Sequence, residues 1–114
     1  MPPDGWRIRI TDILDCIARI ESYTRGFAFE DFRADNKTVD SVLRNLEIIG
    51  EAARYVPQEI QTRYPQIPWK EMQAIRNIVI HEYHGVNLEI IWQTVQENLP
   101  PIVPLLQQIL DQKN

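Results

Sequence analysis

Hydrophobic residues recur along most of this chain at the three- and four-residue spacing of an amphipathic α-helix. This spacing predicts long helices over residues 6–24, 36–56 and 69–84, and a shorter one over residues 88–98. A last helix is expected after the turn at Pro100 and Pro101, and short helical turns around Phe27–Phe32 and Glu59–Arg63. No segment alternates as a β-strand does. The pattern therefore predicts an all-α antiparallel bundle of four to five main helices.

Polar and small residues mark where these helices begin and end. Asp35 or Asn36 can cap the second long helix, and Asn87 can cap the helix that begins at residue 88. Gly26 is expected to end the first helix. Gly50 lies inside a predicted helix, where glycine costs about 1 kcal/mol relative to alanine. A close crossing with another helix would explain why glycine is present there.

Length and composition favour one domain spanning residues 1–114, with 44% hydrophobic residues to form its core. The single cysteine, Cys16, excludes an intramolecular disulfide and fits a reducing compartment. No apolar run has the length of a membrane span, and the first residues lack the features of a signal peptide. A soluble, cytoplasmic protein is expected.

The charge distribution restricts where a polyanion could bind. The net charge is −4, which argues mildly against a general nucleic-acid binder. Eight of the twelve Lys and Arg residues lie within residues 1–54, whereas residues 77–112 contain none. A polyanion would therefore have to be bound by the first two long helices and by Arg76.

The predicted helix 69–84 carries four polar residues whose side chains could take part in catalysis or binding, namely Arg76, Asn77, His81 and Tyr83. In an ideal helix Arg76 and His81 point about 140° apart, so they are not immediate neighbours. They could act on one ligand only if the long Arg76 side chain reaches across, or if a second copy of the helix completes the site. This geometry favours a dimer.

These residues could act on a phosphodiester. Histidine titrates near neutral pH, so His81 could serve as general base or acid. Arg76 could bind a phosphate through two donors, and Asn77 could orient His81 or bind a phosphate oxygen. Taken alone, His81 would more often be an ordinary surface histidine. Glu51 is interpreted chiefly as a solvated charge paired in spacing with Glu47, and alternatively as a residue that lines a cleft. No metal-binding motif is present.

The spacing Arg76-x4-His81-x-Tyr83 resembles the signature of the HEPN superfamily, specifically the HepT-like toxins that are paired with minimal nucleotidyltransferase antitoxins. The segments Arg44–Ala53 (RNLEIIGEAA) and Ile67–Met72 (IPWKEM) are similar to further blocks of that family. The resemblance implies a HEPN-like bundle that acts as a homodimeric, metal-independent RNase without a cofactor.

The same resemblance implies that Arg76, Asn77 and His81 from both subunits meet in one composite cleft. It also implies that the cognate nucleotidyltransferase silences the toxin by adenylylating Tyr83. The alternative from another functional class is a catalytically inactive helical subunit that binds and supports a nucleotidyltransferase.

Overall fold

The computed structural model describes residues 5–81 and 87–112. Within these ranges the chain is helical, without strands, which confirms the predicted all-α bundle. The elements in chain order are α1 (Trp6–Thr24), α2 (Phe29–Ala34), α3 (Asn36–Arg54), α4 (Gln58–Arg63), α5 (Trp69–His81), α6 (Leu88–Gln93), the π-helix η2 (Thr94–Asn98) and α7 (Ile102–Asp111). None of the helices in this part of the chain is long and apolar enough to cross a membrane.

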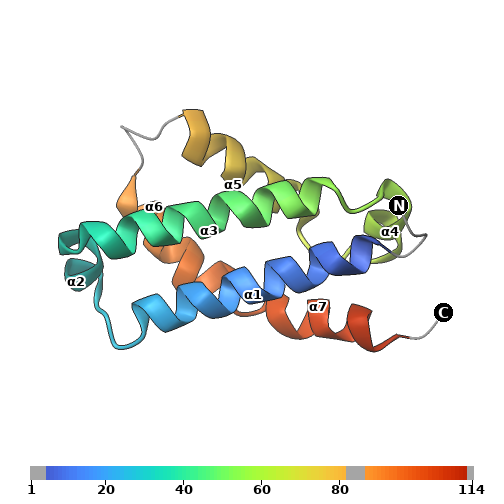
Figure 1. The fold of residues 1–114 in the computed structure, drawn as a ribbon, viewed down its shortest axis with the longest axis horizontal. Coiled ribbons are helices and arrows are strands. Elements are labelled where there is room, and N and C mark those ends of the chain that lie inside the picture. Colours follow the sequence, from blue (N-terminus) through green and yellow to red (C-terminus); the bar gives the residue numbers. More distant parts are fainter. Residues whose placement is uncertain (1–4, 82–86, 113–114) are drawn as a thin grey trace.

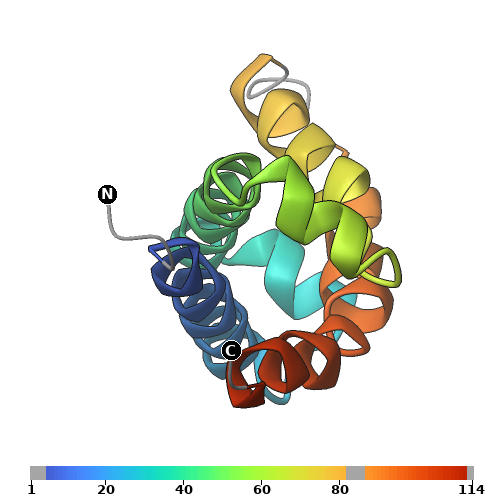
Figure 2. The ribbon, with the colours of Figure 1, turned by 90° about the vertical axis from the view of Figure 1, so that its right-hand side faces the viewer.

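The long helices surround one core. Helices α1 and α3 lie side by side along the length of the molecule, and α5 packs across α3 (Figure 1). Seen along the long axis, α6, η2 and α7 complete the ring, while α2 and α4 lie at opposite ends of it (Figure 2). This arrangement places α5 on the outside of α3, so that only one side of α5 is covered by α3.

The core is formed by the apolar faces that the spacing predicts. Each buried Ile, Leu, Val or Phe side chain contributes about 1.5–3 kcal/mol to stability. Phe32 is fully buried, and its ring centroid lies 5.1 Å from that of Trp92. The side chains with almost no exposed surface include Ile10, Ile13, Ile17 and Ile20 of α1, Val42, Leu46 and Ile49 of α3, Met72 of α5, and Leu106 and Ile109 of α7.

The predicted helix caps are confirmed. Asp35 accepts a hydrogen bond from the Thr38 backbone N–H at 3.1 Å, and the hydrogen bonds from Thr38 lower the pKa of the Asp35 carboxyl. Asn87 accepts hydrogen bonds from two backbone N–H groups in the first turn of α6, at 2.9 and 3.3 Å. Gly26 follows the end of α1 with a φ of 79°, a conformation that glycine adopts without strain.

Two boundaries differ from the prediction. Helix α3 ends at Arg54 instead of residue 56, because Tyr55 leaves the helical region with ψ near 1° and Pro57 lies two residues further on. The predicted helix 88–98 is divided into α6 and a π-helix, in which the Leu99 N–H donates to the Thr94 carbonyl five residues earlier. The predicted end of the 69–84 helix lies outside the described residues, since α5 is described up to His81.

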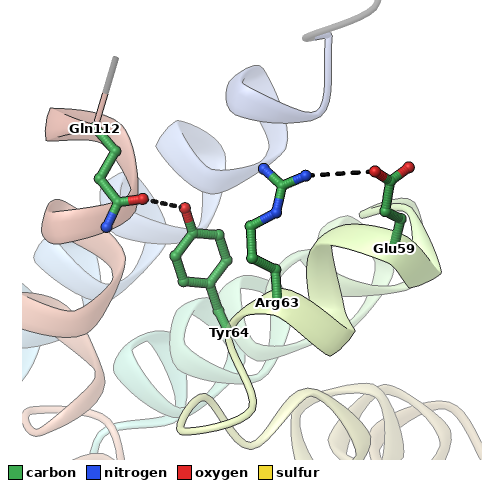
Figure 3. Close-up of polar contacts among 4 residues, drawn as sticks. All are labelled: Glu59, Arg63, Tyr64 and Gln112. Atoms are coloured by element: carbon green, nitrogen blue, oxygen red, sulfur yellow. Dashed lines mark hydrogen bonds and ion pairs between the residues drawn. The ribbon is translucent and has the colours of Figure 1, made fainter. Parts of the chain in front are cut away.

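The end of α7 is attached to the rest of the bundle by side chains of α1 and of the segment after α4. The Tyr64 hydroxyl is hydrogen-bonded to Gln112 Oε1, beside the Arg63–Glu59 ion pair of 3.3 Å (Figure 3). Arg7 of α1 donates to the Leu110 carbonyl, where a cation also complements the helix dipole. These contacts fix the C-terminal helix against α1.

Candidate functional site

The site is built where α3 and α5 cross, and Gly50 allows the crossing to be close. A Cβ added at Gly50 would lie 2.5 Å from Arg76 Cβ and 2.9 Å from the Met72 carbonyl oxygen. No side chain fits in that space without moving the neighbouring helix. The close helix crossing expected at Gly50 is therefore confirmed, and it places Arg76 beside the next residue of α3, Glu51.

Arg76 and Glu51 form an ion pair across this crossing. Arg76 Nε contacts Glu51 Oε2, and the two side chains are 30% and 36% exposed. Glu51 Oε2 is shielded from solvent and accepts no hydrogen bond from any described group, so the Arg76 charge is its nearest compensation. The interpretation of Glu51 as a solvated charge is thus wrong, because the crossing covers one of its oxygens. Glu51 lines a cleft beside the crossing, and its part in a functional site stays a prediction.

The edge of the guanidinium that binds Glu51 determines what the rest of Arg76 can do. Because Nε faces Glu51, both terminal Nη groups are left for another ligand, and among the described residues Arg76 has no second ion-pair partner. On its other oxygen, Glu51 lies 4.0 Å from Arg54 Nη1. Glu51 therefore sits between two arginines and holds one of them in a fixed orientation.

A cleft of about 210 Å³ opens beside this ion pair, between α1, α3 and α5. Among the described residues, its charged lining comprises three arginines and three carboxylates. Four of these six form local pairs: Arg9 with Asp12 at 3.9 Å, and Arg44 with Glu47 at 3.5 Å. Such exposed pairs contribute about 0–1 kcal/mol each, so an anionic ligand can replace them at little cost. The described residues that line it are Arg9, Asp12, Arg44, Glu47, Ile48, Glu51, Ala52 and Arg76.

The other predicted site residues lie on α5 or beyond it. Asn77 is exposed, next to Arg76. His81 is the last residue of α5. Its backbone is described, whereas its side chain lies outside the described part of the structure. Tyr83 also lies outside the described residues. The structure therefore brings Arg76 together with Glu51, while the relation of Arg76 to His81 and Tyr83 stays a prediction.

Sequence reasoning did not identify the contribution of α1 to this cleft. Arg9 and Asp12 reach it from a helix that is remote in the sequence from α5. The available signal was the concentration of basic residues in the first half of the chain, which indicated that the first two long helices would have to bind any polyanion.

The family model described as ribonuclease HepT-like matches residues 13–109. The chain belongs to this family. It is 44% identical to the probable ribonuclease HepT of Thermococcus cleftensis, over 82% of this chain and 84% of that protein. A candidate RNase of Methanocaldococcus jannaschii is 38% identical, over 96% and 91% of the two chains. The mRNA nuclease HepT of Shewanella oneidensis is 29% identical, over 80% and 85%. No solved structure matches this chain.

Proposed function

We propose that this HepT-like protein is a metal-independent endoribonuclease and the toxin of a toxin–antitoxin pair. The observation that carries the proposal is the Arg76 guanidinium, which faces Glu51 through its Nε edge at a cleft and has no second ion-pair partner among the described residues. An arginine oriented in this way can bind two oxygens of one phosphate. The names of the relatives, a ribonuclease and an mRNA nuclease, support RNA as the source of that phosphate.

The proposed reaction needs two acid–base groups and one anion-binding group. One His81 removes the proton from the ribose 2′-hydroxyl, whose oxygen attacks the adjacent phosphorus. A second His81 donates a proton to the departing 5′-oxygen. The products are a 2′,3′-cyclic phosphate and a free 5′-hydroxyl, and Arg76 stabilises the extra negative charge on the phosphorane. Asn77 orients His81 or binds a phosphate oxygen.

The need for two histidines supports a homodimer with a composite cleft. Helix α5 is helical as far as His81, so the ideal separation of about 140° around the axis applies between Arg76 and His81. In this proposal, the α5 helices of two subunits meet near a two-fold axis, and each subunit contributes one Arg76 and one His81. The cognate nucleotidyltransferase is the proposed antitoxin, which adenylylates Tyr83.

A second function is supported by the charge of the cleft. Among the described residues that line it, arginines and carboxylates are equal in number, and the chain as a whole carries a net charge of −4. Such a surface suits a catalytically inactive helical subunit that binds a nucleotidyltransferase. The two functions differ in whether the chain itself cleaves RNA.

An RNA cleavage assay in EDTA tests the proposed catalysis. We expect His81→Ala and Arg76→Ala each to lower the cleavage rate by at least about 10²-fold, because each removes a proton-transfer or charge-stabilising group. His84→Ala is the control, since it removes a neighbouring histidine that does not belong to the spaced motif. Products ending in a 2′,3′-cyclic phosphate would support the mechanism. A strict requirement for Mg²⁺, or full activity of His81→Ala, would contradict it.

A further inference from the structure

Tyr55 is a large aromatic residue that the fold leaves at the surface. It follows the last residue of α3, and 53% of its surface is exposed. Two guanidinium groups lie against its ring: the Arg9 Cζ atom is 5.3 Å and the Arg54 Cζ atom 5.7 Å from the ring centroid. Both distances fall within the range of cation–π interactions. An exposed aromatic ring with two flanking arginines combines stacking surface and positive charge in one place.

This surface adjoins the cleft that contains Arg76. Arg9 contacts Tyr55 and also lines the cleft. Arg54 contacts Tyr55 and lies 4.0 Å from Glu51, the ion-pair partner of Arg76. Glu51 and Tyr55 are four residues apart at the end of α3, which corresponds to about one helical turn, or 6 Å along the axis. Tyr55 therefore lies beside the Arg76 cleft, next to the position proposed for the scissile phosphate.

We infer that Tyr55 is a stacking platform for a nucleobase of single-stranded RNA, and that Arg9 and Arg54 bind the phosphates next to that base. The inference rests on the proposed ribonuclease function and adds a subsite for a nucleotide that flanks the bond to be cleaved. Aromatic rings bind unpaired bases by stacking, with little dependence on sequence. The subsite would therefore strengthen binding of single strands and leave the choice of base open.

The carboxylates near these arginines do not prevent phosphate binding. Arg9 lies 3.9 Å from Asp12, and Arg54 lies 4.0 Å from Glu51, both at the upper limit for an ion pair. The side chains of Arg9 and Arg54 are 36% and 58% exposed, so solvent screens both interactions. A phosphate that approaches the Tyr55 ring can therefore compete with each carboxylate for its arginine.

RNA binding measured without cleavage tests this inference. In a His81→Ala background, a short mixed-sequence single-stranded RNA with a fluorescent end label is titrated with Tyr55→Leu and Tyr55→Trp. We expect Tyr55→Leu to weaken binding by about 5- to 100-fold, the range for losing one base–aromatic stack, and Tyr55→Trp to retain it. Tyr23→Leu is the matched control: Tyr23 is 41% exposed on α1, and no cation–π contact is found for it among the described residues.

A second readout separates stacking from charge. With 2-aminopurine placed at successive positions of the RNA, stacking on Tyr55 should quench its fluorescence at one position, and Tyr55→Leu should remove that quenching. Arg9→Gln should reduce the slope of log K against log salt by about one, as expected for the loss of one phosphate contact. Arg33→Gln is its control, because α2 lies at the opposite end of α3 from Tyr55 (Figure 1).

The outcomes distinguish this inference from the proposed function. If the wild-type protein cleaves RNA and Tyr55→Leu binds it as tightly as the His81→Ala parent, the stacking subsite is wrong and the ribonuclease proposal stands. If the wild-type protein neither binds nor cleaves RNA, both are wrong. If Tyr55→Leu changes the mass of the assembly in light scattering, the patch is an interface between copies of this chain, and the inference is overturned.

Discussion

Replacing Gly50 with alanine would test the geometry on which the candidate site depends. The added methyl group would lie 2.5 Å from the β-carbon of Arg76 and 2.9 Å from the backbone carbonyl oxygen of Met72. Neither atom can rotate away as the end of a flexible side chain could. Overpacking of this kind costs about 1–3 kcal/mol, and the rigidity of both neighbours favours the upper part of that range. Alanine recovers about 1 kcal/mol of helix propensity. We therefore expect the free energy of unfolding to fall by about 1–2 kcal/mol.

Gly50→Ala should lower both the Tm of thermal unfolding and the rate of RNA cleavage. A loss of this size lowers Tm by about 4–8 °C in a chain of this length. Because α5 must move away from α3, Arg76 also moves relative to Glu51, and cleavage measured well below Tm should fall. Gly26→Ala is the matched control. Its φ of 79° makes alanine strained, yet among the described residues no atom beyond the chain neighbours lies within 4 Å of the added Cβ, so stability should fall with activity retained. A Gly50→Ala variant as stable and active as wild type would refute the close crossing.

Two further predictions concern the charges of the site. Glu51→Gln removes the partner that orients Arg76, so kcat for RNA cleavage should fall by about 10- to 100-fold with little change in Tm. The control is Glu47→Gln, because Glu47 lines the same cleft but pairs with Arg44, and its kcat should stay near that of wild type. Equal effects of the two substitutions would contradict the orienting role of Glu51. Tyr83→Phe should keep its RNase activity and escape silencing by the co-expressed nucleotidyltransferase, because AMP on Tyr83 adds negative charge and bulk. If the intact mass of Tyr83→Phe still shows added AMP, or the variant is silenced as well as wild type, Tyr83 is not the switch.

The elements of the fold were predictable from the sequence because their signals are local. Helix spacing, the caps at Asp35 and Asn87 and the end of the first helix near Gly26 each depend on a few neighbouring residues. The division of residues 88–98 into α6 and a π-helix was not predictable. In a segment of five residues, apolar spacing does not distinguish hydrogen bonds to the fourth residue from hydrogen bonds to the fifth.

The contacts of the site were less predictable, because they join separate helices. Which charges meet across α3 and α5 depends on the register and angle of their crossing, and the sequence contains neither. Gly50 was the local signal that a crossing was near, but the pairing of Glu51 with Arg76 and the approach of Arg9 from α1 required the structure. The sequence pointed to Arg76 and Glu51 separately and did not pair them.

The charge of the chain restricts how a ribonuclease of this kind could bind its substrate. With a net charge of −4 and a cleft whose arginines are matched by carboxylates, long-range attraction to RNA is weak. Affinity would then depend on a few oriented contacts at short range. Arg76 suits this task because Glu51 binds its Nε edge and leaves its Nη groups for a phosphate. Stacking on Tyr55 would add affinity that salt does not screen, so an acidic surface and RNA binding are compatible.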